Sequence, residues 1–92
     1  MTATRIWRVE FDRDAARDLR KLGREPQRLI LHYLRTRIAI AQDSRRFGHA
    51  LLGDLKGLWR YRIGDFRIVA RIEDDRFVVL VVTVGHRREV YD

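Results

Sequence analysis

The segment spanning residues 58–73, LWRYRIGDFRIVARIE, alternates apolar and mostly charged side chains around a central Gly64-Asp65 pair. A period of two is typical of a strand with one buried face, and a short Gly-containing pair between two such runs favours a tight hairpin turn. If that pair forms the whole loop, Arg62 lies opposite Arg67. This register predicts a sheet whose two faces differ in chemistry.

The predicted hairpin separates apolar from basic side chains, because residues directly opposite one another share a face of the sheet. One face can be covered by helices and carries Trp59, Tyr61, Ile63, Phe66, Ile68, Ala70 and Ile72. The other face carries Arg60, Arg62, Arg67 and Arg71. Guanidinium groups match phosphate oxygens, so this face is a candidate phosphate-binding surface. The alternative is an edge hairpin that uses charge to stay soluble and to avoid edge pairing.

The remaining chain predicts an α+β domain. Asp12 is a suitable cap for a first helix, and Pro26 suits the first turn of a second helix with Leu29 on its apolar side. The third strand of the C-terminal part is apolar on both faces, which places it inside the sheet. The expected elements are a strand over 4–11, helices over 13–22 and 26–41, a loop over 42–57 with a short strand at its end, and strands over 58–63, 66–73 and 76–84.

This order predicts an N-terminal strand, a helical hairpin and a three-stranded antiparallel meander, with the helices on one face of a mostly antiparallel sheet. At 92 residues we expect a single domain over 1–92. The chain has no cysteine, no apolar leader pattern at its N-terminus and no apolar run long enough to cross a bilayer as a helix. We therefore expect a cytoplasmic protein without a membrane partner.

The charge of the chain points to a polyanionic partner. Its net charge is +7 and its sequence pI is about 11.0. Such a balance favours binding to nucleic acid or to an acidic protein. The alternative is a basic protein without a specific anion site, and composition alone leaves the two open.

The C-terminal segment GHRREVYD, residues 85–92, follows the last predicted strand. His86, Arg87, Arg88 and Tyr91 are residue types that can move protons or stabilise a pentavalent phosphate. Taken singly, His86 suits a hydrogen-bonded turn and Tyr91 suits a packed terminal aromatic. The arginine-rich hairpin nearby favours a site instead.

Two elements in combination, LWRYRIGDFRI and VGHRREVY, resemble the RelE branch of the RelE/ParE toxin superfamily. The resemblance covers most of the chain. It implies a microbial-ribonuclease-type fold, and a type II toxin that cuts messenger RNA in the ribosomal A site. It also implies a RelB-like antitoxin partner, binding to operator DNA only through the antitoxin complex, and attack by the 2′-hydroxyl on the adjacent phosphate without metal or other cofactor.

The resemblance carries over to individual residues. The basic positions of the first hairpin strand match Arg60 and Arg62, and the arginine after the turn matches Arg67. The basic residue after the VG bend matches Arg87, with His86 beside it, and the terminal tyrosine matches Tyr91. These six are the catalytic candidates, and the expected RNA-binding residues are Arg71, Arg88 and Lys56.

The proton acceptor for the 2′-hydroxyl stays open at this point. Tyr91 needs a lowered pKa, whereas imidazole, as in His86, has a more suitable unperturbed value. Some relatives have lysine at the positions of Arg60 and Arg62, and a lysine can lose its proton and act as the base. Arginine stays charged, so a mechanism with a lysine as base is in doubt here. Two other functions also stay open: a ParE-like gyrase-inhibiting toxin, and a non-catalytic module that only binds its antitoxin.

Overall fold

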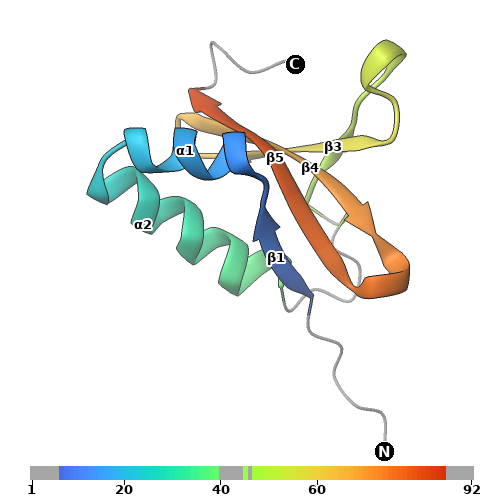
Figure 1. The fold of residues 1–92 in the computed structure, drawn as a ribbon, viewed down its shortest axis with the longest axis horizontal. Helices are drawn as coiled ribbons and strands as arrows, with labels where there is room; N and C mark the ends of the chain where they lie inside the picture. The colour runs from blue at the N-terminus through green and yellow to red at the C-terminus, as the bar shows by residue number, and fades with distance from the viewer. Residues whose placement is uncertain (1–6, 40–44, 46, 87–92) are drawn as a thin grey trace, which may run out of the picture.

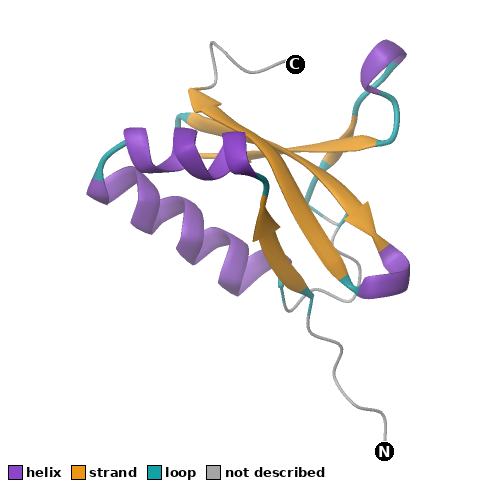
Figure 2. Cartoon of the chain, in the orientation of Figure 1, coloured by secondary structure: helices purple, strands orange, loops and turns teal. Residues whose placement is uncertain are grey.

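The computed structural model describes residues 7–39, 45 and 47–86, which form a five-stranded sheet and a layer of two helices (Figure 1). The strand order is β1-β5-β4-β3-β2. Both helices pack to one side of the sheet, while the loop between β2 and β3 projects away from them (Figure 2). The elements are β1 (Arg8–Phe11), α1 (Arg13–Lys21), α2 (Arg24–Tyr33), a π-helical turn (Leu34–Ile38), β2 (His49–Ala50), a 3-10 turn (Gly53–Leu55), β3 (Leu58–Ile63), β4 (Phe66–Glu73), a 3-10 turn (Asp74–Arg76) and β5 (Val78–His86).

The predicted hairpin register is confirmed. β3 and β4 are antiparallel, and Arg62 lies opposite Arg67 while Arg60 lies opposite Val69. Tyr61 and Ile68, which face each other in the intervening row, are both fully buried. The apolar side chains of the hairpin therefore face the core, as their period of two requires.

The helical layer supplies the other half of the core. Asp12 caps α1 as predicted, because its carboxylate accepts a hydrogen bond of 2.8 Å from the Ala15 backbone N–H. Side chains from both helices and from the π-helical turn then pack against the sheet. This main core includes Ala15, Leu19, Ile30, Leu34, Ile38, Tyr61, Ile63, Ile68, Ala70, Val79, Val81 and Val84.

Two predicted helix features are wrong in detail. The α-helical part of the second helix ends at Tyr33, and a π-helical turn continues it to Ile38 where a regular helix was predicted. The predicted end at residue 41 lies outside the described residues. Leu29 does not belong to the buried side, because it is 45% exposed. Its side chain lies beside Gly64, in the exposed turn between β3 and β4.

The turn before β5 is longer than the predicted two residues. A 3-10 turn occupies Asp74–Arg76, and Phe77 adopts a left-handed conformation with φ of 52°. The last strand therefore starts at Val78 and ends at His86 instead of spanning 76–84. β5 lies inside the sheet as predicted, parallel to β1 and antiparallel to β4, and its Val78, Val79 and Val81 are fully buried.

The chain approaches the sheet very closely just before β2. A Cβ on Gly48 would lie 2.9 Å from Cε1 of Tyr61, and real Cβ atoms essentially never come this near. Because the Tyr61 ring is fully buried, it has little room to move aside. Glycine at this position lets β2 pair with β3.

We expect Gly48→Ala to lower the free energy of unfolding by about 1–3 kcal/mol, the usual cost of overpacking a filled core. Urea denaturation of the variant and the wild type would measure the difference. An unchanged midpoint would mean that the ring of Tyr61 shifts without cost.

An ion pair ties the loop that follows the helices to the turn between β4 and β5. The guanidinium of Arg45 donates to both carboxylate oxygens of Asp74, at 3.0 and 2.5 Å. The same group lies over the Trp59 ring, 5.8 Å from its centroid. The hydrogen bonds from Arg45 lower the pKa of Asp74 below its usual 3.8.

A carboxyl with a lowered pKa in the folded state stabilises the fold above its unfolded pKa and loses that effect as pH falls through the folded value. We therefore expect Asp74→Asn to be less stable than wild type at pH 7. The gap should be small, since the carboxylate is exposed, and it should close below about pH 4. Urea midpoints measured across this range test the expectation, and a gap that does not change with pH would contradict it.

Candidate anion-binding face

The side of the β3–β4 hairpin turned away from the helices carries four arginines, and we call it the arginine face. It consists of Arg60 and Arg62 on β3 and Arg67 and Arg71 on β4. Arg62 and Arg67 are directly opposite, so their side chains leave the sheet on the same side. A rigid hairpin thus presents several fork-shaped donors to one region of space, which suits a phosphate group.

The four arginines differ in exposure. Arg62 and Arg71 are exposed and Arg60 is half-buried, whereas Arg67 is only 7% exposed, with its Nε and Nη1 atoms buried. On its other side Arg67 pairs with Gly85 of β5. Because the Arg67 guanidinium is buried, water screens its charge less than the charges of the other three arginines.

Part of the arginine face is covered by an apolar cluster that the sequence pattern did not predict. Leu51 and Val69 are buried there, and Leu55, Leu58 and Val82 pack against them. The loop between β2 and β3 thus folds over one end of this face and leaves the Arg62–Arg67 end uncovered by it. The signal was the leucine content of LLGDLKGL, which has neither a helical nor a strand period.

His86 does not lie on the arginine face. It pairs with Phe66, and the two rings make an edge-to-face contact with centroids 5.7 Å apart. Phe66 packs against the main core, so both side chains are on the helical side of the sheet. The structure therefore places His86 beside the hairpin but on the face opposite Arg62 and Arg67.

The other predicted residues are only partly placed. Lys56 is exposed in the loop before β3, close in the chain to the covered end of the arginine face. Arg87, Arg88 and Tyr91 lie outside the described residues, so their roles stay predictions. Within the described part, no three His, Asp or Glu side chains cluster so as to hold a metal ion.

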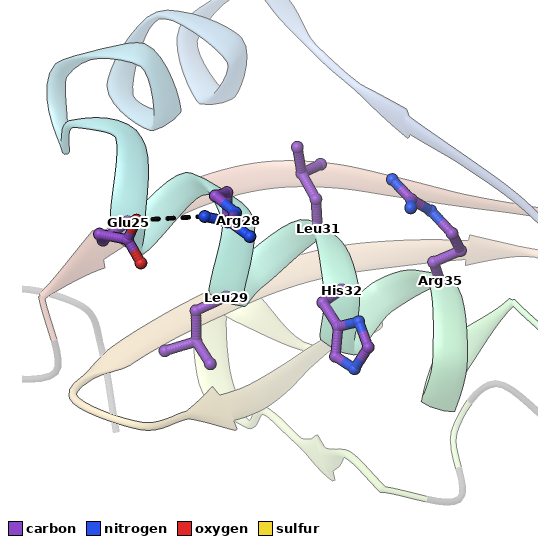
Figure 3. Close-up of a pocket in the computed structure, with 6 residues that line it drawn as sticks. All are labelled: Glu25, Arg28, Leu29, Leu31, His32 and Arg35. Carbon is purple, nitrogen blue, oxygen red and sulfur yellow. Dashed lines mark hydrogen bonds and ion pairs between the residues drawn. The ribbon is translucent and has the colours of Figure 1, made fainter.

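A separate depression lies on the outer side of α2 (Figure 3). Arg28 and Glu25 form an ion pair at its rim at 3.3 Å, and Leu29 points from it toward the turn between β3 and β4. It is on the opposite side of the sheet from the arginine face. The lining residues are Glu25, Arg28, Leu29, Leu31, His32 and Arg35.

In the part of the chain that the structure describes, no helix is both long and apolar enough to span a membrane.

The chain resembles known toxins along most of its length. Residues 9–91 match the model of the family described as the ParE toxin of the type II toxin–antitoxin system, parDE. Toxin RelG of Mycobacterium tuberculosis is 31% identical over 84 residues, covering 90% of this chain and 93% of the relative. Toxin RelE of the same organism is 28% identical over 85 residues, covering 92% of this chain and 86% of the relative.

Solved structures share this fold. A chain in the crystal structure of the RelBE2 toxin–antitoxin complex from Mycobacterium tuberculosis superposes with a TM-score of 0.83 at 26% identity, covering 95% of this chain and 98% of that chain. A chain of the archaeal RelE–RelB complex from Pyrococcus horikoshii gives 0.64 at 21% identity, covering 92% and 99%. The second likeness shows the fold alone, and that fold is the predicted α+β arrangement.

Facing arginines repel one another, so we expect Arg62→Thr to raise the free energy of unfolding by about 0.5 kcal/mol at low salt. Threonine keeps a strand-forming side chain. The control is Arg71→Thr, because Arg71 pairs with Leu58 and Leu80 and its removal relieves no such repulsion. Urea midpoints at low and high salt test this, and equal shifts in both variants would contradict the repulsion.

Proposed function

The chain belongs to the RelE/ParE superfamily of type II toxins, and from this premise we propose that it is an endoribonuclease that cleaves messenger RNA in the ribosomal A site. Cleavage there would inhibit translation. In this proposal the toxin works in the cytoplasm, where it meets ribosomes, and a RelB-like antitoxin neutralises it. Operator DNA is bound only through the antitoxin complex, and no membrane takes part.

The observation that carries the proposal is the opposition of Arg62 and Arg67 on one rigid face, with the Arg67 guanidinium buried. Two like charges placed directly opposite one another lower the stability of the fold. An anion bound between them would offset this repulsion, so a binding function can account for the pairing. A guanidinium fixed in place stabilises charge that develops on a phosphate without having to reorganise. A solvated basic surface would need neither the burial nor the direct opposition.

The proposed reaction is a transesterification within the RNA backbone. The 2′-oxygen attacks the adjacent phosphorus, and the bond from phosphorus to the 5′-oxygen breaks, leaving a 2′,3′-cyclic phosphate and a 5′-hydroxyl. Arg67 and Arg87 neutralise the scissile phosphate, while Arg60 and Arg62 contribute interactions that strengthen in the transition state. The arginines take the place of a metal ion in this scheme, and Arg71, Arg88 and Lys56 bind the flanking RNA.

Substitution of the phosphate-binding arginines tests the proposal. We expect Arg67→Ala and Arg87→Ala each to lower the rate of message cleavage on programmed ribosomes by about 10²–10³-fold. Primer extension in a translation reaction would locate the cuts and measure them. Arg13→Ala, on the exposed side of α1, is the matched control and should cleave like wild type. Intact message at a wild-type concentration that arrests translation would overturn the proposal.

One observation favours a second candidate function, inhibition of DNA gyrase. The family model that matches the chain is that of the ParE toxins. The resemblance of this chain to that branch implies DNA gyrase as the target. A supercoiling assay with purified gyrase and no ribosomes separates the two functions. A non-catalytic antitoxin-binding module is a third reading, and it predicts overexpression without growth arrest.

A further inference from the structure

We propose that the Thr83 hydroxyl donates a hydrogen bond to a non-bridging oxygen of the scissile phosphate. This inference rests on the proposed ribonuclease function and deepens it by adding a neutral donor to the arginine face. Thr83 lies on β5, and it is the one polar residue in the run 77–84, FVVLVVTV. The sheet register brings its side chain to the arginines.

An extra residue in β5 decides which side of the sheet Thr83 occupies. Ala70 of β4 pairs with Val81. Val69, the residue before it, pairs with Thr83, which leaves Val82 as an extra residue in β5. Such a β-bulge re-aims the side chains that follow it, and bulges are frequent beside active sites. Without the extra residue, position 83 would fall on the same side as Val81, which packs in the main core.

The neighbours of Thr83 show independently that it is on the arginine face. Its partner Val69 is buried in the apolar cluster that covers one end of that face. Val84, the next residue along β5, is only 4% exposed and packs in the main core on the helical side. Because consecutive side chains point to opposite sides of a sheet, Thr83 points toward the arginines.

Two arginines of this face adjoin Thr83. Val69 lies between Arg60 and Thr83, so the three side chains form one row across the sheet. In the next row Arg67 pairs with Gly85, two residues beyond Thr83, which makes Arg67 a diagonal neighbour of Thr83. The Cβ atoms of diagonal neighbours are roughly 7 Å apart, and a hydrogen bond adds about 2.8 Å on either side. Arg67 and Thr83 can therefore bind oxygens of one phosphate.

The hydroxyl of Thr83 is available to a ligand. Thr83 is half-buried rather than enclosed. Within the described part of the chain, its hydroxyl has no hydrogen-bonding partner. Valine has the same shape and is the residue on both sides of Thr83 in the sequence, and it would fill this position without removing a polar group from water. A phosphate oxygen would accept the hydrogen bond that the hydroxyl can donate.

A neutral donor suits this position better than another cation would. Arg62 and Arg67 already face each other, and a further positive charge beside them would add to the repulsion. A hydroxyl adds no charge, and its hydrogen bond to a charged oxygen is stronger than one to a neutral acceptor. Negative charge grows on the non-bridging oxygens as the 2′-oxygen attacks, so this hydrogen bond strengthens in the transition state. The Thr83 proton stays on its own oxygen throughout.

Single-turnover cleavage of message on programmed ribosomes tests the assignment. We expect Thr83→Val to slow cleavage by about 10- to 100-fold, the effect of losing one hydrogen bond to a charged group. Its unfolding midpoint should not fall, because valine keeps the shape and the strand preference of threonine. Thr83→Ser keeps the hydroxyl and should cleave within a few-fold of wild type. Thr36→Val is the matched control, an exposed threonine on the π-helical turn, and should cleave like wild type.

Sulfur substitution in the message locates the contact. A sulfur atom accepts hydrogen bonds more weakly than oxygen does, so sulfur at the non-bridging position that Thr83 contacts should slow cleavage by wild type. Thr83→Val has already lost this hydrogen bond. We therefore expect it to show a smaller effect of sulfur at that one position, and an unchanged effect at the other non-bridging position. A slow Thr83→Val variant with the sulfur effects of wild type would overturn direct contact with the phosphate.

Other outcomes keep the contact and the ribonuclease function apart. If wild type and Thr83→Val cleave message at the same rate, the contact is wrong and the ribonuclease proposal stands. If Thr83→Ser is as slow as Thr83→Val, the packing of the methyl group sets the rate, and the hydroxyl contact is wrong. If wild type leaves message intact while translation stops, the ribonuclease proposal fails and the contact fails with it.

Discussion

The β3–β4 hairpin drives apolar side chains to one side of the sheet and guanidinium groups to the other, because opposed residues in a ladder must share a face. Buried Tyr61 and Ile68 hold this register against the helical layer. A slip of one residue would move the whole arginine set into the core, at a cost far beyond the stability of a small domain. The site and the core therefore depend on the same pairing.

The arginine face is assembled at the expense of stability. Arg62 and Arg67 repel one another, and the Arg67 guanidinium is largely removed from water. The apolar cluster around Val69 offsets part of this cost by covering one end of the face. A basic surface with mixed signs would be easier to fold, and the proposed anion binding would account for this cost.

The element order and the hairpin register could be predicted because they depend on local patterns: a period of two, a Gly-Asp turn and the Asp12 cap. The side occupied by His86 could not, because it depends on the length of the β4–β5 turn and on the irregularity in pairing between Val69 and Ala70. Each extra residue in a turn or bulge reverses which face a later side chain occupies.

The position of His49 opposite Arg60 escaped prediction for a related reason. A strand of two residues is too short to show a period, so its pairing with Arg60 is visible only in three dimensions. The packing of the leucines in the neighbouring loop was equally hard to predict, because their partners come from β3, β4 and β5 rather than from their own segment. Long-range pairing, rather than local propensity, decides these positions.

The parallel pairing of β1 with β5 joins residue 8 to residue 78, which are 70 positions apart in a chain of 92 residues. During synthesis the hairpin of β3 and β4 can form early, but β1 has no partner until β5 has left the ribosomal exit tunnel. Contacts so distant in sequence are also slow to form. The sheet is therefore completed at its β1–β5 edge only after residues 78–81 have been synthesised and can pair with residues 8–11.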